Sequence, residues 1–273
     1  MKKRKGRKPK FTAKTADKYD LYQRSVQSAD DDIKFLDRVY QSTRGHRANH
    51  FREDFCGTAL LTATWVKRGP EYTGEGFDID PKPLAWGRNH NFEPIGKAAA
   101  RALLHQKDVR EPSRTAPDLR CAQNFSYCVF KQRSELMEYF CAAYEDLADN
   151  GLFVIDLQGG TESMEETEEE TKVAGGFTYI WDQHEYWPVT AETKCYIHFR
   201  FRDGSEIRRA FTYNWRLWGL AELQDALYEA GFAQVDCYWE GTASDGTSGN
   251  GIFRKTRRGE NCASFIAYLA AFK

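Results

Sequence analysis

Apolar residues in the first part of the chain recur at the spacing that places them on one side of a helix. The pattern extends from Asp17 to Tyr40 and is interrupted near Ser28 and Asp30, two residue types that commonly cap helices. The folded part of the chain is therefore predicted to begin with two helices.

Short apolar runs then alternate with amphipathic stretches. Strands are predicted at 50–56, 72–79, 102–106, 119–125 and 152–157, and helices at 59–68, 81–91 and 134–147. This alternation is typical of parallel strands joined by right-handed crossovers, with helices on both faces of the sheet. We therefore expect a Rossmann-like, doubly wound α/β fold with a mostly parallel sheet.

A different pattern follows Gly159-Gly160. Three strands are predicted at 177–187, 193–202 and 206–213, followed by a helix at 220–230 and strands at 233–239 and 264–272. We expect the three strands to form an antiparallel β insertion, about residues 160–216, in a single domain that spans residues 17–273. The glutamate-rich run 162–170 is predicted to be an exposed helix start or loop, and 241–260 to be a loop.

Composition limits the class of protein. Apolar residues make up 41% of the 273 residues, which is enough for a sizeable core, and no stretch of about 18 apolar residues indicates a membrane span. The first residues lack the apolar segment of a secretory signal, and the seven cysteines lack the C-x-x-C spacing of a zinc site. A cytoplasmic protein without a bound metal is expected.

Charge is unevenly distributed, although the net charge is only −1. The run from Met1 to Lys10 is rich in lysine and arginine, and residues 1–16 are expected to form a disordered, solvated tail. The alternative is an RNA-binding arm that attracts phosphates. Because the net charge is close to zero, bulk electrostatic capture of nucleic acid is the less favoured reading.

Candidate chemistry begins at the turn that follows the first predicted strand of the sheet. Residues 53–59 are Glu-Asp-Phe-Cys-Gly-Thr-Ala, at the strand end where doubly wound sheets bind ligands. Asp78 ends the second strand about 20 residues later, where a carboxylate can accept hydrogen bonds from both hydroxyls of a ribose. Asp80 precedes Pro81 and fits the cap of the next helix better.

These motifs resemble those of class I S-adenosylmethionine-dependent methyltransferases. Glu53 falls on the acidic position of the acidic-x-Gly-Cys-Gly-Thr-Gly signature and Gly57 on its central glycine. Phe55 and Ala59 replace two of the usual glycines, which a dinucleotide-binding dehydrogenase would need for its pyrophosphate. S-adenosylmethionine has no pyrophosphate, so the loss harms a methyltransferase much less.

The resemblance implies S-adenosyl-L-methionine as the cofactor, bound at the ends of successive strands. It places the Asp108 carboxylate by the adenine amino group and the Val109 backbone amide by a ring nitrogen. Arg24 or Arg52 is expected to pair with the methionine carboxylate. The expected cofactor-binding residues are Tyr22, Arg24, Arg52, Glu53, Phe55, Gly57, Asp78, Ile79, Asp108, Val109, Asn124 and Phe125.

Methyl transfer mainly requires alignment of the acceptor with the sulfonium, so no particular catalytic residue is predicted. In the family, N-terminal helices and insertions after the fifth strand bind the substrate. The substrate candidates are Tyr19, Tyr127, His184, Trp187 and Arg216. The many aromatic residues of the insertion either line a pocket for a flat or cationic substrate or form a small second core, and His184 is either a general base or a surface histidine.

Three function classes follow. The first is a methyltransferase for the N- or O-methylation of a small molecule. The second is an RNA or protein methyltransferase that docks through the basic N-terminal arm. The third is a non-catalytic domain that retains the cofactor fold.

Overall fold

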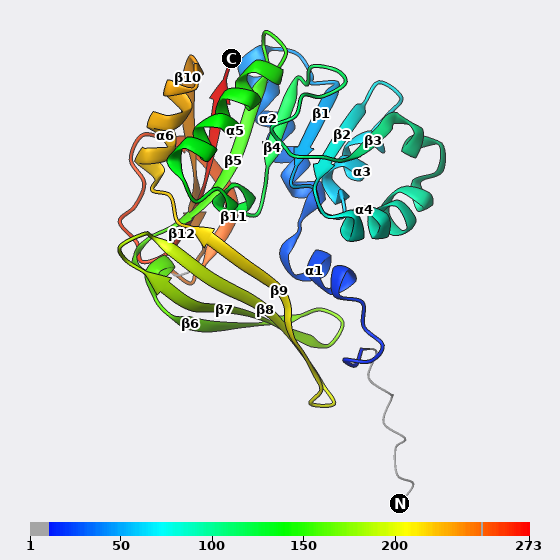
Figure 1. The fold of residues 1–273 in the computed structure, drawn as a ribbon, viewed down its shortest axis with the longest axis vertical. Coiled ribbons are helices and arrows are strands. Elements are labelled where there is room, and N and C mark those ends of the chain that lie inside the picture. Colours follow the sequence, from blue (N-terminus) through cyan, green and yellow to red (C-terminus); the bar gives the residue numbers. More distant parts are fainter. Residues whose placement is uncertain (1–10, 247) are drawn as a thin grey trace, which may run out of the picture. The chain divides into compact units, whose positions relative to one another are not determined.

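The computed structural model describes residues 11–246 and 248–273 (Figure 1). Of the solvated tail predicted at residues 1–16, Met1 to Lys10 lie outside the described residues, whereas Phe11, Ala13 and Ala16 pack against the apolar core around Leu21, so the prediction is wrong for residues 11–16. The chain divides into two compact units, which are described separately. The larger unit contains Ser28–Met164 and Leu217–Lys273, and the smaller unit contains Glu165–Arg216 with the described residues up to Gln27.

An eight-stranded sheet forms the centre of the larger unit, with the strand order β11-β10-β12-β5-β4-β1-β2-β3. Its strands are β1 (His50–Asp54), β2 (Thr73–Asp78), β3 (Ala102–Gln106), β4 (Leu119–Ala122), β5 (Leu152–Gly159), β10 (Gln234–Thr242), β11 (Gly249–Thr256) and β12 (Phe265–Phe272). Strands β1 to β5 are parallel, β12 runs antiparallel to β5 and to β10, and β11 runs antiparallel to β10. The prediction of a doubly wound, mostly parallel sheet is confirmed.

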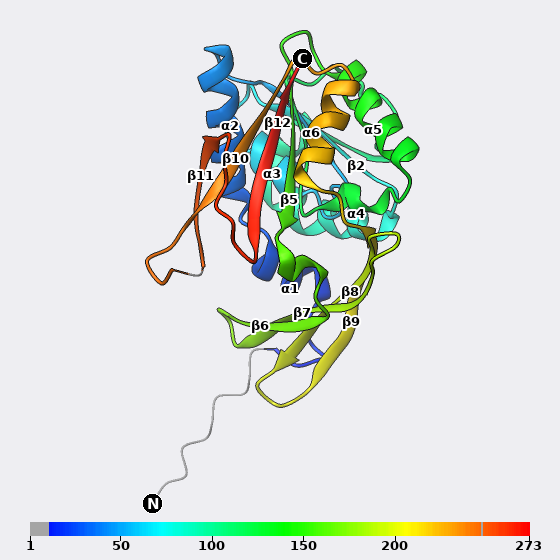
Figure 2. The ribbon, with the colours of Figure 1, turned by 90° about the vertical axis from the view of Figure 1, so that its left-hand side faces the viewer.

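Helices cover both faces of this sheet (Figure 2). They are α2 (Ala29–Arg44), α3 (Leu60–Val66), α4 (Pro81–Gly87), α5 (Arg133–Asp146) and α6 (Leu220–Glu229). The same unit contains the π-helical segment η1 (Arg88–Phe92) and the 3-10 helical segments η2 (Glu93–Arg101), η3 (Ser126–Val129) and η4 (Thr161–Met164). Successive residues of a strand point to opposite faces. Leu152 and Val154 of β5 therefore join the core beneath α2 and α3, while Phe153 packs on Phe140 of α5.

The connection between β3 and β4 contains no helix. Residues 107–118 instead cross the α5 side of the sheet as a loop. A loop lacks regular backbone pairing, so its buried amides and carbonyls need side-chain partners. This need accounts for the charged residues of the central strands: Arg52 and Asp54 of β1 and Arg120 of β4 point to the α5 side and are almost fully buried.

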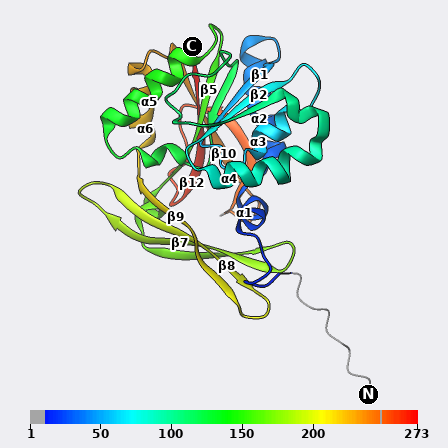
Figure 3. The same ribbon diagram turned by 45° about the vertical axis from the view of Figure 1, so that its right-hand side comes forward.

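The smaller unit is a four-stranded antiparallel sheet with one helix (Figure 3). Its elements are α1 (Lys18–Val26), β6 (Thr167–Val173), β7 (Phe177–Trp187), β8 (Glu192–Phe201) and β9 (Glu206–Arg216), and the strand order is β6-β7-β8-β9. Leu21 of α1 packs with Ile197 and Phe199 of β8 in a separate apolar core. The predicted antiparallel insertion after the fifth strand is confirmed.

Two strands were not predicted, and both lie at sheet edges. The last part of the glutamate run, residues 167–170, belongs to β6, which pairs with β7, so the expected helix start or loop is wrong from Thr167 onward, whereas Thr161–Met164 form the short helical segment η4. The expected loop 241–260 contains β11, which pairs with β10. Edge strands are mostly exposed and are often charged, so neither segment carries the apolar alternation by which a strand is predicted.

Among the described residues, no helix is both long enough and apolar enough to cross a membrane.

Candidate functional site

The turn after β1 holds three residues in the left-handed backbone conformation. Phe55, Gly57 and Ala59 have φ values of 51°, 52° and 52°. For residues other than glycine this conformation costs on the order of 1 kcal/mol. The two residues that replace signature glycines thus keep a glycine-like backbone. A Cβ atom added to Gly57 would meet no atom within 4 Å, so the backbone there borders open space.

Asp78 joins this turn to the end of β2. Its carboxylate accepts hydrogen bonds from the backbone N–H groups of Gly57, at 2.7 Å, and of Asp80, at 2.8 Å. Burial raises the pKa of Asp78, and the two N–H groups oppose this effect. Asp80 caps α4, as predicted, by accepting from the Lys82 N–H at 2.9 Å. Ile79, between the two aspartates, is 71% exposed.

Glu53 points to the opposite face of the sheet from Arg52 and holds the start of α3. It is 4% exposed, and its carboxylate accepts from the N–H and the hydroxyl of Thr62 at 2.8 and 2.6 Å. Burial raises the pKa of Glu53 to about 7, although the bonds from Thr62 lower it. Its observed role is to join α3 to β1.

The strand predicted at 119–125 ends at Ala122, because Asn124 and Phe125 also have a left-handed backbone, with φ values of 58° and 57°. Their N–H groups donate to the carboxylate of Asp156 at 2.6 and 2.9 Å. Asp156 is buried on β5, and burial raises its pKa to about 7. The sequence reasoning did not select Asp156, although an acidic residue within the apolar run 152–157 is a signal that could have found it.

Tyr127 is a core residue and not the expected substrate contact. Its side chain is fully buried, and its hydroxyl donates to the Asp156 carbonyl at 2.8 Å. A side chain without exposed surface cannot meet a substrate unless the surrounding core opens.

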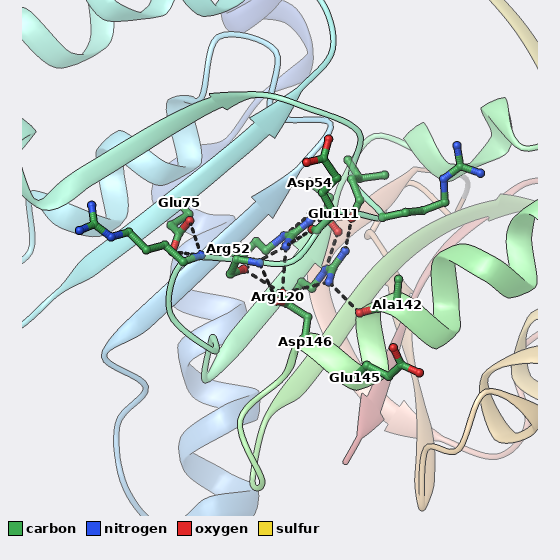
Figure 4. A network of polar contacts seen from close by, with 12 residues as sticks. Arg52, Asp54, Glu75, Glu111, Arg120, Ala142, Glu145 and Asp146 are labelled. Carbon is green, nitrogen blue, oxygen red and sulfur yellow. Dashed lines mark hydrogen bonds and ion pairs between the residues drawn. The ribbon is translucent and has the colours of Figure 1, made fainter.

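Arg52 belongs to a buried ionic network rather than to a cofactor-carboxylate site (Figure 4). Its Nε donates to Asp54 at 2.7 Å and its Nη1 to Asp146 of α5 at 2.9 Å. Arg120 makes the matching contacts, with Nε at 2.7 Å from Asp54 and Nη1 at 3.1 Å from Asp146. The expectation that Arg52 pairs with the methionine carboxylate is therefore wrong, because its donors are occupied and it has no exposed surface.

This network also holds the loop between β3 and β4. The Nη2 atoms of Arg52 and Arg120 both lie 2.6 Å from the Val109 carbonyl oxygen. Further along the loop, Glu75 of β2 accepts from the N–H groups of Arg114 and Thr115 at about 3 Å. Burial alone would raise the pKa of Glu75, but hydrogen bonds from His50 and these amides lower it to about 2.

Asp108 and Val109 lie at the start of the loop. Asp108 forms a two-bond ion pair with Arg110, at 2.9 and 2.8 Å, which lowers the pKa of its carboxyl. Arg110 in turn contacts Glu138 of α5. Asp108 is thus ionised and already paired. Val109 as a whole is 3% exposed, and its N–H makes no hydrogen bond to any described residue.

In the smaller unit, the three candidates on α1 contact their own unit. The rings of Tyr19 and Tyr22 lie 6.0 and 4.9 Å from that of Phe211. Arg24 pairs with Asp20 on the same helix, with Nε 2.8 Å from its carboxylate. Arg24 stays a predicted partner of the methionine carboxylate.

The other candidates of the insertion lie on β7 and β9. His184, with a 40% exposed side chain, sits at the irregularity between Gln183 and Glu185, and Trp187 is 45% exposed. Trp187 and Arg216 both pair with Glu192, so they flank the same end of β8.

Most of the insertion's aromatic residues pack on one another. Tyr213 lies 5.8 Å from Trp181 and 4.4 Å from Trp215 between ring centroids, and both Trp181 and Tyr213 contact the core around Leu21. The small second core is therefore the better reading for these three.

Glu168, Asp182 and His198 offer ligand atoms within 4.8 Å of one another, a grouping absent from the sequence expectations. However, the Arg209 N–H donates to His198 Nδ1 at 2.7 Å, so the proton of a neutral imidazole sits on Nε2 and is donated to Asp182 at 3.1 Å. Metal-bound histidines donate from the nitrogen that does not bind the metal. Both nitrogens of His198 are otherwise engaged, which favours a structural pair.

Comparison with solved structures places this arrangement of strands among known folds. An S-adenosylmethionine-dependent methyltransferase from Clostridium acetobutylicum aligns with a TM-score of 0.65, over 93% of this chain and 96% of its own, at 16% identity. The chain has the class I methyltransferase fold. No protein-family profile and no curated protein sequence matches it.

Two further structures share this fold. One is an amino pentose methyltransferase from Micromonospora echinaspora involved in calicheamicin biosynthesis, solved with S-adenosylmethionine bound. Its TM-score is 0.67 at 16% identity, over 94% of this chain and 97% of that one. The other is a sugar N-methyltransferase from a Streptoalloteichus species, with a TM-score of 0.60 at 18% identity, over 93% and 92%.

Proposed function

We propose that this chain is an S-adenosylmethionine-dependent methyltransferase. The observation that carries the proposal is the left-handed turn at Phe55, Gly57 and Ala59, fastened to Asp78 at the ends of two adjacent parallel strands. The turn keeps the backbone shape that the signature's glycines allow, at an energetic cost that an ordinary strand-to-helix turn does not require. Strain of this kind is typical of functional sites.

The residues at these strand ends fit the cofactor. Asp78 would accept from the ribose hydroxyls, and the exposed Ile79 would cover one face of the adenine. The Val109 N–H, which has no partner among the residues that the structure describes, would donate to a ring nitrogen. The open space beside Gly57 leaves room for the amino acid part of the cofactor. When bound, the cofactor supplies the electrophilic methyl group, and the residues named here orient it.

We further propose a small molecule as the methyl acceptor, with an amine as the first class to test. Two of the structures that share the fold are described as an amino pentose methyltransferase and a sugar N-methyltransferase. The antiparallel insertion follows β5, where substrate-binding insertions occur in the resembled family. His184 stays a candidate base, since its partly exposed imidazole could accept a proton from an ammonium acceptor.

Binding of S-adenosylhomocysteine, measured by calorimetric titration with NAD as the negative control, tests the cofactor. The sharpest variant is Gly57→Ala, because its methyl group would enter the space proposed for the cofactor. Gly45→Ala is the matched control, since Gly45 also has a positive φ, of 74°, and also has no atom within 4 Å of an added Cβ. Gly45 ends α2, away from the strand ends of the site.

Both variants should lose similar stability, about 1 kcal/mol, from the left-handed backbone. Only Gly57→Ala should weaken binding, by tenfold or more. Equal weakening in both variants, or binding of NAD in place of S-adenosylhomocysteine by the parent, would contradict the proposal. Transfer of a labelled methyl group to a panel of amino sugars, hydroxylated analogues and RNA then identifies the acceptor class.

A further inference from the structure

We propose that Arg52 and Arg120 act as a positioning pair that fixes the Val109 backbone and thereby sets the selectivity of the cofactor site for adenine. This inference rests on the proposed function, because it concerns the base of the cofactor. Neither arginine would touch the cofactor, since both side chains are completely buried.

The two guanidinium groups converge on a single carbonyl oxygen. Arg52 reaches the Val109 oxygen from β1 and Arg120 reaches it from β4, each at 2.6 Å. Charge-assisted hydrogen bonds of this kind are short and strong, and two donors from adjacent strands restrict the carbonyl in two directions. Asp54 bridges the Nε atoms of both arginines at 2.7 Å, so neither guanidinium can turn without breaking that bridge.

The segment from Lys107 to Val109, which would contact the adenine, is held by hydrogen bonds at both ends. At its start, the Lys107 N–H donates to the Asp78 carbonyl at 3.1 Å, which connects it to the end of β2. At its end, the arginine pair holds the Val109 carbonyl. Only Asp108 and the Val109 amide lie between these two points. The Val109 N–H has no partner among the described residues, so its direction is set by the groups that hold the rest of the segment.

Charged groups are needed here because the β3–β4 connection lacks a helix. In a helix, successive backbone bonds would fix each peptide, whereas residues 107–118 depend on side chains from the sheet and from α5. The charges of Arg52 and Arg120 are balanced by Asp54 and Asp146, so the cluster is neutral as a whole. Its geometry, rather than any net charge, would therefore act on the site.

Selectivity between two bases provides the test. Adenine N1 accepts a hydrogen bond, whereas the same position of hypoxanthine carries a proton and donates one. A fixed Val109 N–H should therefore reject the hypoxanthine ligand. We expect the parent protein to bind S-adenosylhomocysteine at least about 100-fold more tightly than S-inosylhomocysteine in calorimetric titrations.

Arg120→Lys keeps the positive charge but cannot reach Asp54, Asp146 and the Val109 oxygen together. It should reduce the preference for adenine about tenfold. Tyr139→Phe is the matched control, because the Tyr139 hydroxyl donates to Asp54 of the same network at 2.8 Å, whereas the Val109 carbonyl is held by the two arginines. This variant should lower the melting temperature and leave the preference unchanged.

The outcomes are separable. Circular dichroism verifies that the Arg120→Lys variant is folded. If the folded variant keeps the parental preference for adenine, the positioning role is overturned and the two arginines have a purely structural role. Arg52→Lys carries the same expectation, so the conclusion does not depend on one variant folding. A parent protein that binds neither ligand would remove the proposed function as well, whereas a parent that binds both equally would overturn the positioning role alone.

Discussion

Asp78 offers the most direct test of the proposed cofactor site, with Asp78→Asn as the change to make. Burial raises the pKa of Asp78, so without a ligand its charge is unfavourable to the folded state. Asparagine removes that charge and keeps one oxygen to accept from the Gly57 or Asp80 N–H. Loss of the second acceptor offsets the gain, so the free energy of unfolding should change by no more than about 1 kcal/mol.

Affinity should respond far more than stability. A hydrogen bond to a charged group contributes about 1.5–3 kcal/mol and a neutral one about 0.5–1.5 kcal/mol. Replacing the charged acceptor of two ribose hydroxyls by a neutral one should therefore reduce the binding free energy by roughly 2–3 kcal/mol in total. The dissociation constant of S-adenosylhomocysteine should rise roughly 30- to 150-fold. Calorimetric titration measures the affinity, and urea denaturation of the same samples measures the stability.

Asp80→Ala is the control, two residues along the chain. It removes the cap of α4 and should cost about 1 kcal/mol of stability with little change in affinity. Parental affinity in Asp78→Asn combined with weak binding in Asp80→Ala would refute the assignment and show that the wrong aspartate had been given to the ribose.

Three further predictions concern other parts of the chain. Burial raises the pKa of Glu53 from 4.5 to about 7, so the carboxyl loses its proton at lower pH in the unfolded state, and the free energy of unfolding should fall as pH rises from about 4.5 to 7. In denaturation curves, Glu53→Gln should reduce that fall by an amount on the order of 3 kcal/mol. An unaltered pH dependence in this variant would contradict the assignment. Ala59→Gly should change the free energy of unfolding by less than about 0.5 kcal/mol, because relief of the left-handed backbone offsets the lost burial of the methyl group. Ala63→Gly, within α3, should cost about 2 kcal/mol. Similar losses in both variants would argue against strain at Ala59. Deletion of Met1 to Lys10 should leave methylation of a small acceptor intact, while salt-sensitive RNA binding that disappears with the deletion would support the RNA alternative.

The central parallel strands β1, β2, β4 and β5 were predictable because they are buried on both faces. Leu152 to Leu157 of β5, for example, forms an almost uninterrupted apolar run followed by glycines. The edge strands β6 and β11 were not predictable, since their side chains face solvent and their pairing depends on a neighbour. The grouping of α1 with residues 165–216 is a contact across more than half the chain, which local periodicity cannot report.

The candidate site was predictable where backbone geometry leaves a local signature. Gly57, Asp78 and Asp80 follow strand ends at a recognisable spacing, and the structure joins all three by hydrogen bonds. Arg52 was assigned incorrectly because two of its partners, Asp146 and the Val109 carbonyl, lie far along the chain and no motif connects them to β1. A strand arginine can serve a ligand or a buried network, and only its burial distinguishes the two.

The buried network of two arginines and two aspartates also implies an unusual response to heat. Hydration of charged groups becomes less favourable as temperature rises, so the cost of keeping these four side chains away from water decreases on warming. Apolar contacts elsewhere in the core gain no such advantage. The loop 107–118 should therefore be among the last parts of the sheet's α5 side to loosen during heating.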